Sequence, residues 1–97
     1  MDKRPYNEVV QQYYASQMIQ VPQDCNGYVA VNCGDTILWV NGFRLLPAPG
    51  PGLSGESKGA IGNKDEIYTG NNGQIQLTVD KAVGIAPFLQ IVFKFYI

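Results

Sequence analysis

The stretch of sequence that decides the fold is Phe88-Leu-Gln-Ile-Val-Phe-Lys-Phe-Tyr-Ile97. From its second residue on, every other side chain is a large apolar one, which is the period of a β-strand with one face in a core. This stripe consists of Leu89, Ile91, Phe93, Phe95 and Ile97. Burial of five such side chains contributes on the order of 10 kcal/mol before the entropic cost of folding is counted. We therefore expect this strand to be central to a β-structured core.

The opposite stripe of the same strand is itself half apolar. It contains Phe88, Val92 and Tyr96 together with Gln90 and Lys94. A face in contact with water is usually more polar than this, so we expect a second sheet or another subunit to cover it.

Further short strands are predicted upstream of this one by alternation and by turn signals. They span 18–21, 28–31, 36–40, 43–46, 66–68 and 74–79. Asn-Gly dipeptides at 26–27, 41–42 and 72–73 predict type I′ hairpin turns, in which both central residues need positive φ. The segment Pro47–Gly62 is rich in proline and glycine and is predicted to be an irregular loop. The pattern predicts an all-β fold, a small β-sandwich or jelly roll of about seven to eight short antiparallel strands.

Residues 1–17 differ from the rest and are predicted to be an N-terminal arm preceding a β-sandwich domain at 18–97. Asn7 is an acceptable helix N-cap, and Val9, Val10, Tyr13 and Tyr14 recur at helical spacing. A short amphipathic helix or a docked arm is therefore expected. A helix of about twelve residues is marginal in isolation, so the arm must pack on its own domain or on a neighbour.

Composition limits the classes of function. The 97 residues suffice for one domain, and their 7 basic and 8 acidic side chains give a net charge of −1. This balance disfavours nucleic-acid binding. Charged residues make up 15%, against about 25% in an average domain, so the surface is poor in charge. The apolar stretches fall short of the roughly 18 residues that cross a bilayer, and no signal-peptide core follows Met1. We expect a protein made in the cytoplasm, with no membrane partner.

The residues offer no catalytic, cofactor or metal site. The chain has no histidine, which removes the commonest general base and metal ligand. Cys25 and Cys33 lack zinc-finger spacing, and an extended segment would hold them about 26 Å apart, too far for a disulfide. We expect both to be free buried thiols. Asp65-Glu66 would point to opposite faces of a strand, and Glu56 stands where a phosphate-binding loop needs lysine.

Aromatic and apolar side chains near the two termini are instead predicted to form an interface, because tyrosine is favoured at protein contacts. The predicted interface residues are Tyr6, Val9, Val10, Tyr13, Tyr14, Phe88, Val92 and Tyr96. Trp39 alternates with Ile37 and is interpreted as a core or interface residue rather than a sugar-stacking platform.

The segment Asn32-Cys-Gly-Asp-Thr-Ile-Leu-Trp-Val-Asn-Gly-Phe-Arg-Leu-Leu-Pro47, with Gly62-Asn63, Glu66-Ile67-Tyr68 and the final Ile91–Tyr96, resembles small β-sandwich structural proteins of bacteriophages. The resemblance covers about residues 28–97 and consists of turns and strands. It implies a virion role such as a capsid decoration, vertex, spike or fibre-base subunit. The loop Pro47–Gly62 is longer and richer in proline than that pattern.

Two functions from different classes follow. The first is a non-enzymatic structural subunit of a virion or similar assembly, which forms a homo-oligomer and contacts other structural proteins. The second is a carbohydrate-binding or host-recognition module with Trp39 or the loop Pro47–Gly62 at its site. An enzyme is disfavoured because histidine is absent.

Overall fold

A computed structural model describes residues 6–47, 49, 53, 55–62, 66–70, 73–80 and 86–96. Over these residues the fold is all-β, as predicted: eight antiparallel strands form two four-stranded sheets, a small β-sandwich. The strands are β1 (Tyr6–Tyr13), β2 (Gln17–Gln20), β3 (Gly27–Asn32), β4 (Leu38–Val40), β5 (Phe43–Leu45), β6 (Ser57–Ile61), β7 (Gln74–Val79) and β8 (Leu89–Tyr96). Within the described ranges there is no helix, and so none that could span a membrane.

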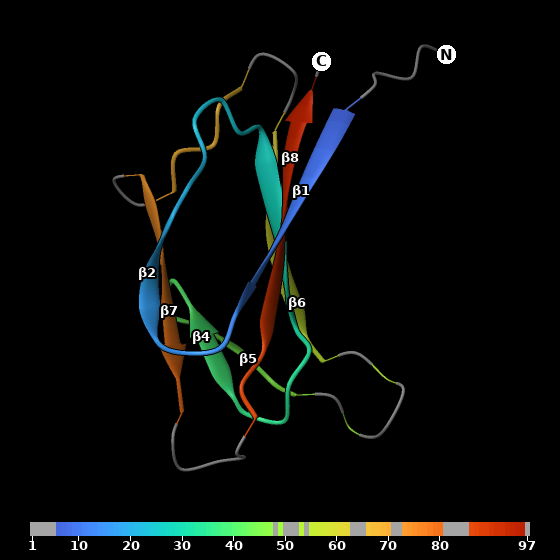
Figure 1. Cartoon of the computed structure of the whole chain (residues 1–97), viewed down its shortest axis with the longest axis vertical. Coiled ribbons are helices and arrows are strands. Elements are labelled where there is room, and N and C mark those ends of the chain that lie inside the picture. Colours follow the sequence, from blue (N-terminus) through green and yellow to red (C-terminus); the bar gives the residue numbers. More distant parts are fainter. Residues whose placement is uncertain are drawn as a thin grey trace.

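The strand order shows how the chain is folded. One sheet has the order β1-β8-β3-β6 and the other β2-β7-β4-β5 (Figure 1). Strand β1 pairs with β8, β2 with β7, β3 with β6 and β4 with β5, so that the two numbers of each pair add to nine. The chain is thus one long two-stranded ribbon, doubled over at the β4–β5 turn and folded into two layers. This is the connectivity of a jelly roll.

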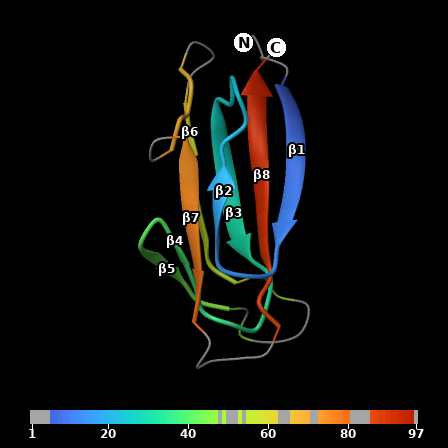
Figure 2. The same cartoon turned by 60° about the vertical axis from the view of Figure 1, so that its left-hand side comes forward.

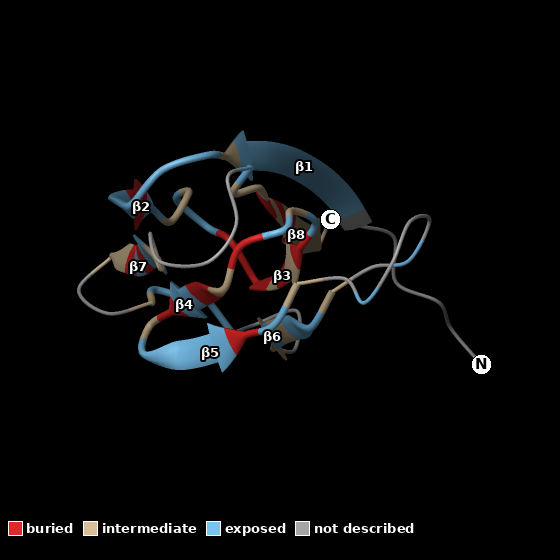
Figure 3. Ribbon diagram, turned by 90° about the horizontal axis from the view of Figure 1, so that it is seen from below, coloured by how far each residue is buried: buried red, intermediate tan, exposed pale blue. Residues whose placement is uncertain are grey.

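The core lies between the two sheets, and β8 is central to it, as its alternation predicts. Leu89, Ile91 and Phe93 are fully buried, and Phe95 packs against them. Strand β8 has a neighbour on each side, β1 and β3. Figure 3 shows the buried residues gathered between the layers. The outward stripe of β8, Val92 and Tyr96 among them, is half-buried.

The helix expected in the N-terminal arm is wrong, because residues 6–13 form strand β1. Eight residues of this segment pair in register with β8, from Tyr6 opposite Tyr96 to Tyr13 opposite Leu89. A lone helix of this length is marginal, whereas the β-branched Val9 and Val10 favour a strand once a partner is present. The arm therefore packs on its own domain.

Strand β6 lies inside the segment predicted to be an irregular loop, so that prediction is wrong over Ser57–Ile61. The prolines of this segment end at position 51, before β6 begins. None of them therefore removes a backbone N–H donor from the strand. Gly59 is required by packing, since a Cβ there would lie 2.6 Å from the carbonyl oxygen of Tyr28. The glycine that suggested a loop is what lets β6 approach β3.

Of the predicted Asn-Gly turns, one is confirmed. Asn41 and Gly42 have φ of 50° and 84°, as a type I′ turn between β4 and β5 requires. The turn at 26–27 is wrong: the buried Asn26 accepts a hydrogen bond from the Tyr96 amide at 2.8 Å and donates one to the Glu66 carbonyl at 2.6 Å. Those distant contacts override the local preference. Asn72 lies outside the described residues.

The strand predicted at 66–68 is also absent, and these residues have no regular structure. They are held instead by single hydrogen bonds with the 25–26 segment, including one from the Tyr68 amide to the Cys25 carbonyl at 2.7 Å. One such bond fixes a connection without making a ladder.

Candidate functional site

Strand β1 is uncovered on both of its faces. Every side chain from Asn7 to Gln12 is exposed, and Val9 and Val10 keep 40% and 51% of their surface accessible. One edge of β1 pairs with β8, and no described strand pairs with the other. Figure 2 shows β1 as the outermost strand of its sheet, curving along β8. We call strand β1, with its exposed faces and unpaired side, the open edge.

The open edge extends beyond the cover of the second sheet. Val9 lies directly opposite Phe93, so the two side chains share the inner face of the sheet. Phe93 is buried, but Val9 is not, which means that the second sheet covers β8 and leaves β1 bare from Asn7 to Gln12. Burying apolar surface is the main favourable term in folding, and β1 has little of it. This strand is therefore held chiefly by its pairing with β8.

A row of valines crosses the outer face of the same sheet. Val10 lies opposite Val92, and Val92 lies opposite Val29 on its other side. We call these three residues the valine row. Val92 and Val29 are half-buried and Val10 is exposed, so the row becomes more accessible toward the open edge. Val29 is not among the residues predicted from the sequence to form the interface, because alternation identifies the strand without indicating which of its faces meets the core.

Charge is sparse on this surface. Glu8 is the only charged residue of β1, and it lies opposite Lys94 of β8. Opposite charges directly across a strand pair are favourable. Between Asn7 and Gln12 the open edge therefore presents valine, glutamine and asparagine side chains around a single carboxylate.

The structure brings the first and last described strands together, and with them the eight residues predicted to form an interface. Six of these residues form three pairs across β1 and β8 or just beyond them. Tyr6 lies opposite Tyr96, Val10 lies opposite Val92, and the ring centroids of Tyr14 and Phe88 are 5.1 Å apart. Val9 and Val10 are exposed on opposite faces of β1. The sequence placed these residues toward the two termini without indicating that the strands β1 and β8 pair.

Tyr13 differs from the other predicted interface residues. Its ring is half-buried and packs against the core, opposite Leu89. Burial raises the pKa of its phenol above the ordinary value. Tyr13 thus anchors one end of β1 to the sandwich, while Tyr14 next to it is exposed.

Beside Tyr14 lies an open hollow of about 570 Å³. Its described lining is Tyr14, Cys33, Gly34, Asp35, Ala86, Pro87 and Phe88. The Asp35 carboxylate accepts hydrogen bonds from the Ala86 amide at 2.8 Å and the Thr36 hydroxyl at 2.9 Å. A Cβ on Gly34 would lie 2.3 Å from the Ala86 carbonyl oxygen, so this glycine is needed for close packing. The polar groups of the hollow thus hold two segments of backbone together.

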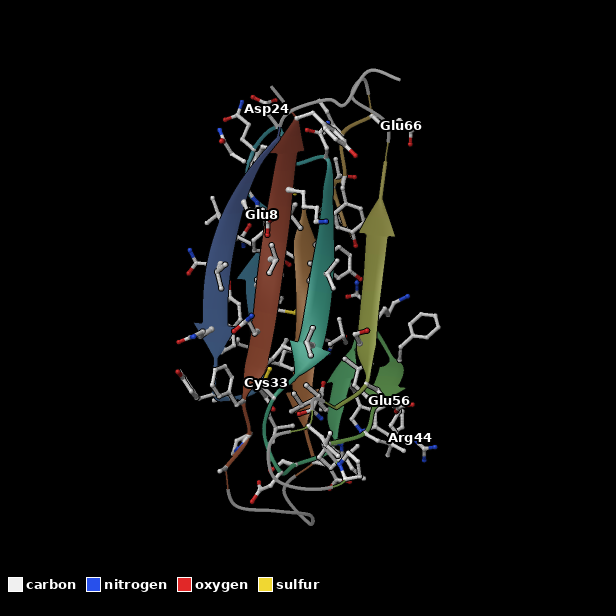
Figure 4. All side chains as sticks on the ribbon, turned by 90° about the vertical axis from the view of Figure 1, so that its right-hand side faces the viewer. Glu8, Asp24, Cys33, Arg44, Glu56 and Glu66 are labelled. Atoms are coloured by element: carbon white, nitrogen blue, oxygen red, sulfur yellow. The ribbon has the colours of Figure 1, made fainter. Side chains whose placement is uncertain are left out.

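The cysteines and carboxylates do not converge. Cys25 is buried and its thiol donates to the Gly27 carbonyl at 3.0 Å, whereas Cys33 is exposed, which corrects the expectation that both thiols are buried. Cys33 immediately follows the last residue of β3, at the start of the connection to β4. The described part of the chain has no cluster of three potential metal ligands. Figure 4 shows its labelled carboxylates apart, with Asp24 and Glu66 near one end and Glu56 near the other.

Trp39 lies on the outer face of the second sheet, between Thr78 and Arg44 in register. Its neighbours in the chain, Leu38 and Val40, are buried, while Trp39 is 36% exposed. The tryptophan is therefore not a core residue. An accessible indole with a hydroxyl and a guanidinium beside it has the chemistry of a stacking surface with polar neighbours.

Comparison with models of protein families, with curated proteins and with solved structures finds no match to this chain. The geometry of the open edge and the valine row is therefore the principal observation that bears on function.

Proposed function

We propose that this protein is a non-enzymatic structural subunit of a larger assembly, and that the assembly is a virion, with the chain as a phage capsid accessory, vertex, spike or fibre-base protein. The contacts are made by the open edge and the valine row. The observation that carries the proposal is the exposure of β1 on both faces. A strand eight residues long that buries so little of itself gains its covering from a neighbour.

Two further features support this role. The jelly roll is an architecture of viral capsid proteins, and also of lectins and cupins, so it favours the proposal by analogy of fold alone. The net charge of −1 gives weak electrostatic repulsion between copies. A chain whose surfaces are occupied by neighbours tolerates that weak repulsion.

Sedimentation and fractionation test the proposal together. Purified protein is followed by sedimentation velocity over a wide range of concentration, and extracts of cells that make it are fractionated and probed with an antibody. We expect a defined oligomer, recovery of the chain with large particles, or both. A chain that is monomeric throughout and never found with particles would overturn the proposal.

A second candidate function, glycan recognition, is favoured by the accessible Trp39 with Thr78 and Arg44 beside it. Sugars stack on aromatic faces and hydrogen-bond to such polar neighbours. A glycan array compares the wild type with Trp39→Ala, using Phe43→Ala as a matched control because Phe43 is an exposed aromatic on the adjacent strand. Binding lost only in Trp39→Ala supports recognition. The absence of any binding by the wild type contradicts it.

A further inference from the structure

The four outermost strands of the two sheets differ in length and in how they are protected. Strands β6, β2 and β5 have five, four and three residues, whereas β1 has eight. Lys58 lies in β6 and Arg44 in β5, but β1 contains no lysine, arginine or proline. Native sheets guard their edges with short strands, basic residues and proline, because an unpaired backbone is a template for another strand. Only β1, among the described edges, is long and lacks these protections.

We propose that β1 pairs in antiparallel fashion with β1 of a second copy of this chain, so that two four-stranded sheets become one of eight strands. The inference rests on the proposed function and names the first partner in the assembly. The two-fold axis of such a pair is perpendicular to the sheet, which keeps both inner faces on the same side. Residues that face each other must therefore both be even-numbered or both odd-numbered, and this restricts the possible registers.

The side chains of β1 select one of those registers. Centring the pair on Glu8 would place two carboxylates directly opposite each other, which is destabilising. Centring it on Val9 would place Glu8 against Val10 of the second copy. Centring it on Val10 places Glu8 opposite Gln12, whose amide can donate to the carboxylate, and Val10 opposite Val10.

In the Val10-centred register, the valine rows of the two copies become continuous. Val29, Val92 and Val10 of one copy meet Val10, Val92 and Val29 of the other across the new strand pair. The exposed end of each row is thereby covered by the exposed end of the other. On the inner face, Val9 lies opposite Gln11 of the second copy, so the exposed inner faces of the two β1 strands also adjoin.

Cysteine cross-linking tests the register, in a Cys33→Ser background that removes the exposed native thiol. Directly opposite residues have Cα atoms about 4.5–5.5 Å apart, within the range of a disulfide. Val10→Cys is therefore expected to form a covalent dimer on mild oxidation. Gln12→Cys is the matched control on the same face. Its two copies would be about 13 Å apart and are expected not to cross-link with each other.

A mixture supplies the complementary measurement. Glu8→Cys protein combined with Gln12→Cys protein is expected to give the mixed disulfide, because residues 8 and 12 face each other in this register. A Gln12→Cys homodimer formed in preference to the Val10→Cys homodimer would overturn the inferred register.

Self-association is measured by sedimentation with a second pair of variants. Val10→Lys places two ammonium groups at the centre of the pair and is expected to weaken dimerisation by about tenfold or more. Gln12→Lys faces Glu8 of the second copy and is expected to leave dimerisation unchanged or stronger. Both side chains are exposed, so thermal unfolding of the two variants at a low protein concentration, where the chain is monomeric, should match the wild type and separate loss of pairing from loss of folding.

The outcomes distinguish this inference from the proposed function. A wild-type chain that is monomeric but recovered with large particles would overturn self-pairing and leave the structural role intact, with another protein on the open edge. A monomer that is never found with particles would overturn both. Equal weakening of dimerisation by Val10→Lys and Gln12→Lys would overturn the Val10-centred pairing.

Discussion

Strands β1 and β6 are the two edges of one sheet, and they differ in length, in charge and in how firmly they are fixed to the domain. Strand β6 is short, contains Lys58, and packs its backbone closely on β3 at Gly59. Hydrogen bonds fix the chain just beyond each end of β6. One runs from the Gly62 amide to the Asn26 carbonyl and the other from the Gly55 amide to the Asn32 carbonyl, each at 3.0 Å. Strand β1 is longer, exposed on both faces and paired with β8.

This difference indicates a division of roles within a single sheet. An edge that is fixed to the rest of the domain contributes stability, whereas an edge that is held chiefly by its pairing with one neighbour is available to pair with another strand. Substitutions near β6 should therefore change the free energy of unfolding. Equivalent substitutions in β1 should leave it nearly unchanged.

The largest difference in the free energy of unfolding is expected between the variants Asn32→Ala and Asn7→Ala. The buried Asn32 amide donates to the Thr36 and Leu45 carbonyls, both at 2.9 Å, and its oxygen accepts from the Gly34 amide. Removal of this side chain leaves the buried backbone groups that it contacts without this partner. We expect the free energy of unfolding to fall by about 3 kcal/mol. Asn7 in β1 is exposed, and we expect a change below about 0.5 kcal/mol. Urea denaturation measures both, and equal effects would contradict the division of roles.

The next comparison lies within one row of the sheet, where Gly59 and Val10 occupy the two edges. Gly59→Ala forces its new methyl group against the Tyr28 carbonyl and should destabilise the fold by roughly 2 kcal/mol. Val10→Ala removes exposed apolar surface and should change stability by less than about 0.5 kcal/mol in the monomer. Thermal unfolding at a low protein concentration isolates the monomer. A Gly59→Ala protein as stable as the wild type would show that β6 can move.

Alkaline pH separates the interior of this sheet from its open edge, because Tyr28 lies in β3 and Tyr13 lies in β1. Burial, together with the charge of Tyr68 and a hydrogen bond to it, raises the pKa of Tyr28, and burial raises the pKa of Tyr13. The unfolded chain releases these protons near pH 10 while the folded chain keeps them, so stability falls as the pH rises above about 10. The slope reaches at most about 1.4 kcal/mol per pH unit for Tyr28.

Denaturation of variants as a function of pH assigns that slope. Tyr28→Phe should remove most of the loss of stability above about pH 10, and Tyr13→Phe should remove a smaller part. A Tyr28→Phe protein with the slope of the wild type would show that other groups cause the alkaline loss.

The smallest expected effect concerns the interaction between Lys58 and Phe43. The Lys58 ammonium lies 3.7 Å from the centroid of the Phe43 ring, across the β6 and β5 edges. Lys58→Met keeps the length of the side chain and removes the charge, so we expect a loss of about 0.5 kcal/mol. Lys58→Arg retains a cation and serves as the control. Identical stability of the methionine variant and the wild type would mean that this contact contributes nothing to the β6 edge.

Alternation in the sequence was sufficient to predict six of the eight described strands, because their side chains face a core on one side. The stripe Leu89, Ile91 and Phe93 of β8 and the turn at Asn41-Gly42 were found in this way. Strand β1 was missed because neither of its faces is buried, which leaves no alternation to detect. The β-branched pair Val9-Val10 was the available signal, since such residues disfavour a helix.

The candidate site was predicted in part. The sequence indicated Val10, Val92 and Tyr96 as contact residues, but which strands lie side by side depends on how the ribbon doubles over. Gly59 illustrates the same limit, since a glycine required by a close approach to β3 cannot be told from a flexible one by composition. Pairing between distant segments is set by contacts that no local pattern contains.

The pairing of β1 with β8 also determines the order in which the domain can be completed. Strand β1 leaves the ribosome first of the eight strands, and its neighbour β8 leaves last. The β4–β5 hairpin can close early, but each further pair of the ribbon joins segments more distant along the chain, and closing a longer loop costs more entropy. The sheet is therefore finished only after translation has passed Tyr96. Until then β1 has no β8 to pair with. The rate of translation and the spacing of ribosomes on one messenger RNA should therefore influence whether β1 pairs first with its own β8 or with a strand of another nascent copy.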